Sequence, residues 1–152
     1  MVVERIFISP IRGAAQIECE HITVQTGAGI VGDRNFGLSA YNGQNLTLVE
    51  AEELDAFCER YERALDMSLS RRNLVTRGVR LNDLLNRQFR VGSVLLRGVE
   101  LCEPCLTLGS LLSNELLTLP TAIKHWVGRG GLRVDVLEGG QICIGDQIED
   151  DA

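Results

Sequence analysis

The sequence contains Leu69-Ser-Arg-Arg-Asn-Leu-Val-Thr-Arg-Gly78, then Phe89-Arg-Val-Gly-Ser-Val-Leu-Leu96, and then Cys102-Glu-Pro-Cys105. Apolar and β-branched residues with glycine breaks fill this stretch, which is typical of short strands. Two adjacent arginines and an asparagine precede the strands, and a thiol after a proline follows them. Arginine forks bind phosphate and carboxylate oxygens bidentately, and neighbouring cations depress the pKa of a thiol. The stretch therefore predicts a site that holds an anion beside a thiolate.

The segments around this stretch predict the fold class. Apolar runs bounded by glycine or proline indicate strands at residues 2–8, 16–25, 45–49, 88–97 and 99–102, and a hairpin of 132–137 with 141–148 through the turn 138–140. A change of alternation within 16–25 predicts a β-bulge. We therefore expect a mainly β (α+β) fold in which short strands form a closed or nearly closed β-barrel.

Helices are expected at the margins of this barrel. The clearest one starts at Glu50, where apolar residues recur at helical spacing: Leu54, Phe57, Cys58, Tyr61 and Leu65. Cys58 is on this stripe and is expected to be a small core residue. A helical turn at 81–85 and helices at 106–117 and 121–127 are also predicted. The barrel should thus have two to four flanking helices.

Length and charge limit the possible classes of protein. The 152 residues fit one domain, residues 1–152, and the net charge of −6 argues against nucleic acid and anionic membranes as partners. Charges near the N-terminus interrupt the apolar run that a signal peptide needs, and the chain contains no apolar run of membrane-spanning length. Five cysteines form an odd set without a small secreted framework, so we expect reduced thiols in a cytoplasmic protein.

Residues 27–32 match the pattern G-x-G-x-x-G, but they do not predict a dinucleotide site. That fingerprint requires a helix to open at the loop, and Asp33-Arg-Asn-Phe-Gly37 does not indicate one. The glycines are expected to form turns. Asp33 and Arg34 then have two interpretations: they orient each other or a ligand, or they form an exposed ion pair.

Cys102-Glu-Pro-Cys105 has three interpretations. A zinc site would need Cys19 and His21 as further ligands, and a dithiol pair would need a βαβ pattern that the chain lacks. In the third, the helix predicted from Leu106 stabilises a thiolate at Cys105 through its dipole. Such a thiolate suits a soft or high-valent metal.

The order of the motifs resembles the MOSC domain family, named for the C-terminal domain of molybdenum cofactor sulfurases. The resemblance covers nearly the whole chain and is closest to the stand-alone bacterial members. It rests on these segments: Gly32-Asp33-Arg34, Leu46-Thr47-Leu48, Arg71-Arg72-Asn73-Leu74 with Gly78, Phe89-Arg90-Val91-Gly92, Pro104-Cys105, Gly128-Arg129-Gly130-Gly131 and Gly145-Asp146. It implies a barrel of the MOSC or pyruvate-kinase-barrel type.

The resemblance also implies a function. Cys105 matches the family cysteine that ligates the molybdenum of a pterin cofactor, or carries a persulfide. The cofactor is anionic, which favours binding by arginines, and the candidates for holding it are Asp33, Arg34, Arg71, Arg72, Asn73, Arg129 and Gly130. Arg129 and Gly130 belong to a glycine loop that forms either an anion nest or an ordinary turn. The expected activity is reduction of N-hydroxylated small molecules; the alternative is a carrier of sulfur or cofactor without turnover.

Two further expectations follow from the resemblance. Larger relatives contain an extra N-terminal barrel or a fused electron-transfer domain, and this chain has neither, so electrons should come from a separate flavin or iron–sulfur protein. Pyridoxal phosphate has been associated with the family by inference. A Schiff base here would have to use Lys124, the one lysine, which lies in no phosphate motif, so this cofactor is not expected.

Overall fold

The computed structural model describes residues 1–62, 64, 66–103 and 118–151. Most strands belong to a sheet of eight, in the order β11-β7-β8-β9-β5-β6-β1-β2, and the others form a sheet of three, β10-β3-β4. The strands are β1 (Val2–Ile8), β2 (Ile17–Cys19), β3 (His21–Gln25), β4 (Gly29–Ile30), β5 (Leu46–Glu50), β6 (Leu74–Arg77), β7 (Gln88–Val91), β8 (Val94–Leu101), β9 (Leu132–Glu138), β10 (Gly140–Cys143) and β11 (Ile148–Asp150). The helices are α1 (Ala51–Arg60) and α3 (Leu119–Trp126), with 3₁₀ turns η1 (Met67–Ser70) and η2 (Leu81–Leu84). The fold is thus mainly β, as predicted.

The expected closed barrel is not found in the described part of the chain. The large sheet is mixed, because β5 pairs with β6 in parallel while its other pairings are antiparallel. Its two ends meet at one isolated bridge, Val2 with Gln147. Three backbone hydrogen bonds accompany this bridge: the Val3 amide to the Asp146 carbonyl at 3.0 Å, the Gly145 amide to the Val3 carbonyl at 2.8 Å and the Ile148 amide to the Met1 carbonyl at 2.9 Å. β11 is only three residues long, and β2 pairs only with Ile6, Phe7 and Ile8 at the far end of β1. No continuous ladder of paired strands therefore joins the two ends of the sheet.

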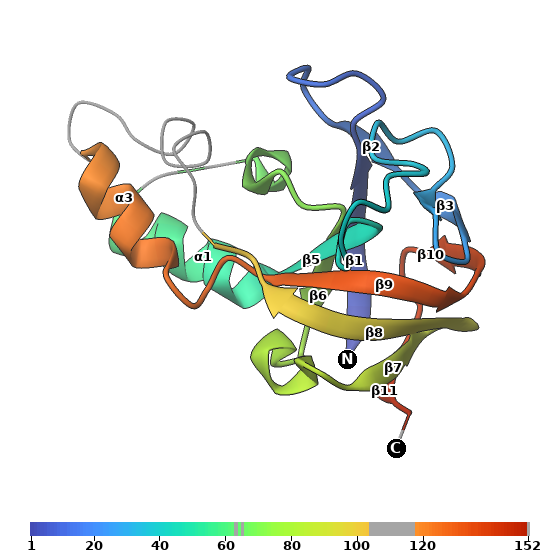
Figure 1. The fold of residues 1–152 in the computed structure, drawn as a ribbon. Helices are drawn as coiled ribbons and strands as arrows, with labels where there is room; N and C mark the ends of the chain where they lie inside the picture. Colours follow the sequence, from blue (N-terminus) through green and yellow to red (C-terminus); the bar gives the residue numbers. More distant parts are fainter. Residues whose placement is uncertain (63, 65, 104–117, 152) are drawn as a thin grey trace.

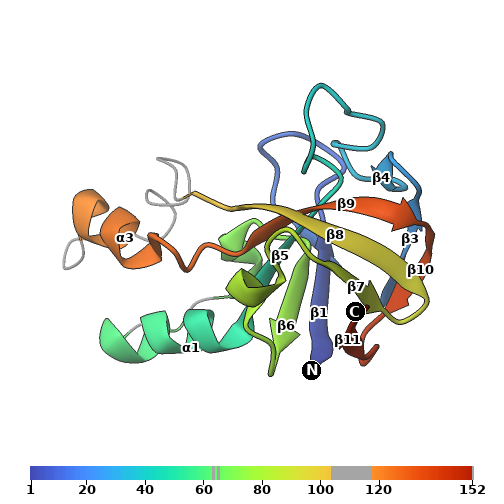
Figure 2. The same ribbon diagram turned by 60° about the horizontal axis from the view of Figure 1, so that its bottom comes forward.

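Strand alternation gives the large sheet two apolar faces. Leu48 and Leu74 point into the larger core cluster, whereas Val49 and Val75, the next residue of each strand, join Phe57 and Trp126 in a second cluster with α1 and α3. Figures 1 and 2 show both helices on the same side of the molecule. The helices therefore bury one face of the sheet, while the other face contributes to the main core.

Several predicted elements are confirmed. Strands at 2–8 and 45–49, the turn at 81–85, and the helices starting near Glu50 and Thr121 are all present within two residues or so of their predicted starts. The helix predicted at 106–117 lies outside the described residues. None of the described helices is long and apolar enough to cross a membrane.

The predicted hairpin of 132–137 with 141–148 is wrong. β10 pairs with β3 in the small sheet, and β9 pairs with β5 and β8 in the large one. A Cβ at Gly139 would lie 2.5 Å from the Val24 carbonyl, so the turn passes against β3 instead of folding back on β9. The glycines allow the chain to change sheets.

Two strand boundaries also differ from the prediction. The segment 16–25 contains no bulged strand; it divides at Glu20 into β2, which pairs with β1, and β3, which pairs with β10. The break between β7 and β8 falls at 92–93, and Gly98 lies inside β8. A Cβ at Gly98 would collide with the Leu84 carbonyl, so this glycine permits η2 to approach the strand.

Candidate functional site

Arg71 has an unusual backbone and lies at the end of β1. It ends η1 with φ 60° and ψ 25°, the left-handed region that costs a non-glycine residue about 1–2 kcal/mol. Its Nη1 donates to the Ala14 carbonyl at 2.7 Å, and its Nη2 lies 3.5 Å from Ser9 Oγ. Strain of this kind is common at binding sites. The conformation directs the guanidinium across the loop that joins β1 to β2.

Asp33 is buried and organises the same region. Its Oδ1 accepts from the Ser9 amide at 2.8 Å and its Oδ2 from the Asn35 amide at 3.1 Å. The Arg34 amide donates to the Ser9 carbonyl at 2.9 Å, while the Arg34 side chain is exposed. Asp33 and Arg34 form no ion pair with each other. The carboxylate thus fixes the loop backbone, and the backbone presents the exposed cation.

Arg34 and Arg71 lie close enough to repel each other. Burial, together with the positive charge of Arg34, lowers the pKa of the Arg71 guanidinium, and the negative charge of Asp33 opposes this. Two like charges raise each other's free energy, although solvent weakens the effect at the exposed Arg34, and an anion between them would lower it. The structure therefore brings these two predicted residues together in an arrangement that favours an anion.

Arg72 points towards a different loop from Arg71. It is buried, and its Nε donates to the Gly130 carbonyl at 2.9 Å. A Cβ at Gly130 would lie 2.5 Å from the Cys102 carbonyl and 3.7 Å from Arg72 Nη2. Only glycine leaves room for this approach. Arg72, Gly130 and the end of β8 consequently form a second cluster.

Cys102 is a buried thiol in that cluster. Burial raises its pKa, while the charges of Arg72 and Arg133 and a hydrogen bond with Arg72 act in the opposite direction. The raised pKa keeps the thiol neutral at pH 7, which agrees with a structural role at the end of β8. Cys105, the predicted thiolate and molybdenum ligand, lies outside the described residues.

The Asn73 amide joins three strands. Its Oδ1 accepts from the amide and the hydroxyl of Thr47, both at 3.1 Å, and its Nδ2 donates to the Phe7 carbonyl at 3.1 Å. Its backbone also bonds to both of these residues. The structure gives Asn73 a structural role between β1, β5 and β6, and its contact with a cofactor stays a prediction.

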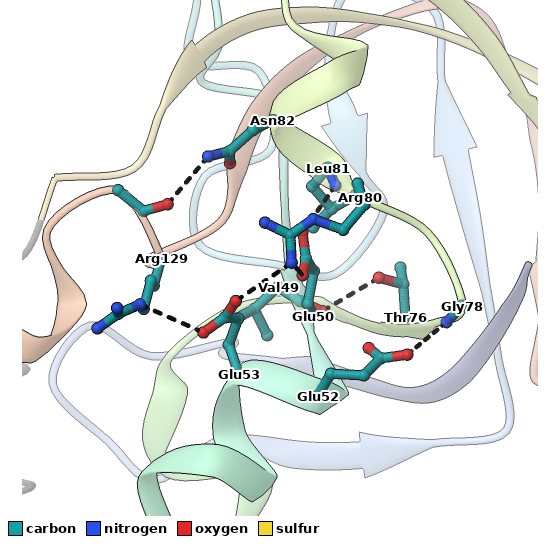
Figure 3. Close-up of polar contacts among 11 residues, drawn as sticks. Val49, Glu50, Glu52, Glu53, Thr76, Gly78, Arg80, Leu81, Asn82 and Arg129 are labelled. Atoms are coloured by element: carbon teal, nitrogen blue, oxygen red, sulfur yellow. Dashed lines mark hydrogen bonds and ion pairs between the residues drawn. The ribbon is translucent and has the colours of Figure 1, made fainter.

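Arg129 turns towards α1. Its Nε lies 3.7 Å from Glu53 Oε2, and Asn82 Nδ2 donates to the neighbouring Gly128 carbonyl at 3.0 Å (Figure 3). The Arg129 Nη1 also donates to the His125 carbonyl at 2.9 Å. Arg80 lies 3.5 Å from the other Glu53 oxygen. These contacts hold the loop that supplies the Gly130 carbonyl to Arg72. Binding of a ligand by Arg129 itself stays a prediction.

Ion pairing separates the arginines into two groups. Eight pair with carboxylates within 4 Å: Arg5, Arg77, Arg80, Arg87, Arg90, Arg97, Arg129 and Arg133. Five described arginines pair with no carboxylate of the described chain: Arg12, Arg34, Arg60, Arg71 and Arg72, of which Arg60 lies over the Tyr61 ring. Most arginines on or next to strands are therefore neutralised, as expected for edge residues, and three candidates for the site are not.

A groove opens beside the second cluster, and the sequence did not indicate it. It has a volume of about 590 Å³, and its described lining residues are Leu85, Asn86, Val99, Glu100, Leu101, Glu103 and Arg133. Arg133 pairs with Glu100 at 3.4 Å and its charge also reaches Cys102. The sequence also did not indicate Ser9 and Ala14 as neighbours of Arg71. Their hydroxyl and carbonyl contact this arginine only because the fold brings distant segments together. Within the described residues, no group of three or more histidine, cysteine or acidic side chains is placed to hold a metal ion.

The fold and the arginines define the class: a small, mainly β domain with unneutralised arginines around the ends of a large mixed sheet. The sequence matches the family model for the MOSC domain over residues 33–149. The match covers most of the chain, so this protein belongs to the MOSC domain family. The resemblance inferred from the motif order is confirmed.

Solved structures agree with this assignment. The chain is similar to the YuaD protein from Bacillus subtilis, with 18% identity, a TM-score of 0.83, and coverage of 97% of this chain and 93% of that chain. YiiM from Geobacillus stearothermophilus gives 17% identity and a TM-score of 0.74, with 99% and 75% covered. YiiM from Escherichia coli gives 16% and 0.69, with 100% and 70% covered. Identities this low show the fold alone, and a comparison with curated proteins gives no match.

Proposed function

We propose that this MOSC protein binds a molybdenum–pterin cofactor and reduces N-hydroxylated small molecules. The observation that supports the proposal is the group of three arginines, Arg34, Arg71 and Arg72, without carboxylate partners in the described chain. A pterin cofactor carries a phosphate and further negative charge, and arginine forks suit such oxyanions. The repulsion between Arg34 and Arg71 fits this group, because a bound anion relieves it.

Each arginine has its own part in this proposal. Arg71 and Arg34 hold the anionic end of the cofactor at the β1–β2 loop. Arg72, fixed by the Gly130 carbonyl, contributes positive charge beside the end of β8. Cys105, outside the described residues, is proposed as the thiolate ligand, since it follows Cys102 by three residues. When bound, the cofactor supplies two-electron redox chemistry at molybdenum.

The groove beside β8 is the proposed place for the substrate. It is bordered by the Arg133–Glu100 pair and by apolar side chains of Leu85 and Val99. A pocket with apolar walls and a few polar groups suits a small organic molecule. The separate flavin or iron–sulfur electron donor and the cytoplasmic location remain predictions.

Metal and pterin analysis tests the cofactor. The protein is expressed in a host that makes the cofactor, then molybdenum is measured by mass spectrometry and pterin by the fluorescence of its oxidised form. We expect equal amounts of both in the wild type and a loss of at least tenfold in Arg71→Ala. Arg87→Ala is the matched control, because Arg87 pairs with Asp150 near the C-terminus. Wild-type protein without molybdenum or pterin would refute the proposal.

A second experiment separates the enzyme from the carrier alternative. The intact mass of the protein is measured by mass spectrometry with and without reductant. In parallel, oxidation of a reduced dye is followed in the presence of a hydroxylamine substrate. Turnover that Cys105→Ser abolishes supports the enzyme. A reductant-sensitive gain of one sulfur, without turnover, supports the carrier. Full activity of Cys105→Ser would remove this cysteine from the mechanism.

A further inference from the structure

The groove beside β8 has walls that close backbone contacts hold in place. The turn after η2 lies against β8, where the Asn86 amide donates to the Gly98 carbonyl and the Gly98 amide donates to the Arg87 carbonyl, both at 3.0 Å. Gly43 packs against Arg133, because a Cβ at this glycine would lie 3.2 Å from the Arg133 Cβ. The groove volume of about 590 Å³ falls within the range of about 300–1,000 Å³ that small-molecule sites occupy. The groove is therefore preformed and large enough for a small organic molecule.

The lining of the groove has an apolar part and a polar part. Leu85, Val99 and Leu101 are half-buried, and Leu85 and Leu101 also pack against the main core. The polar part includes Asn86, whose φ of 62° lies in the left-handed region. Asparagine adopts this region more readily than most residues, and such backbone positions are concentrated at binding sites. The groove thus combines aliphatic contact surface with a fixed amide that can donate or accept a hydrogen bond.

The charges of the lining do not cancel. Arg133 Nε lies 3.4 Å from Glu100 Oε1, and these two residues neutralise each other. Glu103 is exposed and forms no ion pair within the part of the chain that the structure describes. The charge of Arg72 reaches Cys102, next to Glu103, but the Arg72 side chain is buried. One carboxylate therefore remains uncompensated at the groove, in a protein whose net charge is also negative.

We propose that the groove binds a primary ammonium group attached to an apolar body. This inference rests on the proposed function, whose substrate it narrows to N-hydroxylated compounds that carry a separate ammonium group. An ammonium has three N–H donors, which the Glu103 carboxylate and the Asn86 side-chain oxygen can accept. A hydrogen bond between charged groups is about twice as strong as one between neutral groups. The apolar body of the ligand contacts Leu85, Val99 and Leu101.

The lining disfavours three other kinds of ligand. A carboxylate or phosphate would have to displace Glu100 from Arg133, and it would then meet the negative charge of Glu103. A metal ion would need more ligands than two glutamates, and no group of three or more histidine, cysteine or acidic side chains is placed to hold one among the residues that the structure describes. A neutral molecule would gain the apolar contacts without a charge-assisted hydrogen bond. An organic cation uses both parts of the lining.

Binding of small probes to the full chain tests the site without turnover. Three probes of similar size are compared: phenethylamine, which is an ammonium at pH 7, the neutral phenethyl alcohol and the anion hydrocinnamate. The Kd of each is measured by NMR on isotopically labelled protein, with the methyl signals of Leu85 and Val99 and the side-chain amide of Asn86 as reporters. We expect phenethylamine to bind at least about tenfold more tightly than the other two probes. Preferred binding of hydrocinnamate, equal binding of all three, or no binding of phenethylamine at millimolar concentration would overturn the inference.

Two variants and a matched control test the role of the carboxylates. Glu103→Gln should raise the Kd of phenethylamine about tenfold. Glu100→Gln releases Arg133 from its pair, so it should weaken binding of phenethylamine and strengthen binding of hydrocinnamate. Glu138→Gln makes the same charge change at the other end of β9, where Glu138 pairs with Arg90, and should change the Kd less than about twofold. All three glutamates are exposed, so the variants should melt like the wild type. An unchanged Kd in Glu103→Gln would overturn the inference.

Turnover separates failure of this inference from failure of the proposed function. Two arylhydroxylamines are compared with a reduced dye as donor, one with an aminomethyl group and one with a methyl group at the para position. Each turnover takes two electrons from the dye and two protons, breaks the N–O bond and yields the amine and water. We expect the aminomethyl compound to have a KM about tenfold lower, an advantage that Glu103→Gln removes. Equal KM values would overturn the inference, whereas absence of turnover with both compounds in molybdenum-loaded protein would refute the proposed function and leave the result of probe binding standing.

Discussion

The buried imidazole of His125 should make the folded protein less stable at mildly acidic pH, because the unfolded chain takes up a proton there that the folded protein does not. His125 on α3 is 8% exposed and packs against Phe57, Tyr61 and Trp126 with ring centroids 5.0–5.5 Å apart. Neither ring nitrogen finds a hydrogen-bond partner within the described chain. Burial, then the charges of Arg129 and Arg60, lower its pKa from 6.5 to about 4. The imidazole is therefore neutral in the folded protein at pH 5 and protonated in the unfolded chain.

The sign and size of the effect follow from these two pKa values. Between about pH 6.5 and pH 4 the unfolded state binds the extra proton, so stability falls as the pH is lowered. The loss in the free energy of unfolding caused by His125 is close to zero at pH 7 and about 2 kcal/mol at pH 5. It approaches a limit of about 3 kcal/mol below pH 4, where both states are protonated.

Urea unfolding from pH 4.5 to pH 8 measures this cost. Trp126 is the one tryptophan and touches His125, so its fluorescence reports unfolding at the relevant place. The wild type should lose about 2 kcal/mol between pH 7 and pH 5 relative to His125→Phe, because carboxylates that titrate in the same range are common to both proteins and cancel. His21→Gln controls for the loss of an exposed imidazole. A wild type and His125→Phe with parallel pH profiles would refute the assignment of a buried, neutral imidazole.

Three further predictions concern the candidate site. Asn73→Ala should destabilise the fold by about 3 kcal/mol in urea unfolding, because it leaves the half-buried Thr47 amide and the buried Phe7 carbonyl without their side-chain partner; a loss below about 1 kcal/mol would contradict the strand-joining role. Gly130→Ala should cost about 1–3 kcal/mol through contact with the Cys102 carbonyl, whereas Gly128→Ala, with no neighbour within 4 Å, should cost only about 1 kcal/mol for its positive φ; equal losses would argue against the close approach. Arg71→Gly should have a free energy of unfolding about 1 kcal/mol higher than Arg71→Ala, since only glycine adopts the left-handed backbone without strain. Both variants should lose the cofactor. Equal stability of the two would show that the backbone relaxes.

The sequence predicted local structure more reliably than the pairing of distant strands. The helical spacing in α1 and the apolar run in β1 are properties of a few neighbouring residues, and the helix and the strand that they predict are both present. The partner of β10 depends on whether the turn at Gly139 folds back or passes against β3, which is decided by a carbonyl of Val24, more than a hundred residues earlier in the chain. Glycines in a turn permit both outcomes. The same limit explains why a change of alternation at Glu20 was interpreted as a bulge when it marks a change of sheet.

The site shows the same limit for charged groups. Residue type alone could not separate site arginines from arginines on the surface, and the structure supplies the criterion that the sequence lacked, namely which arginines pair with carboxylates. Arg129 pairs with Glu53 across two helices, whereas the adjacent Arg71 and Arg72 diverge to different loops without a pair in the described chain. Because an unneutralised, partly buried guanidinium raises the free energy of the folded protein, it is retained only if something else repays that cost. The anionic ligand proposed for Arg34 and Arg71 would do so, and for this reason the lack of carboxylate partners matters more to the proposal than the number of arginines.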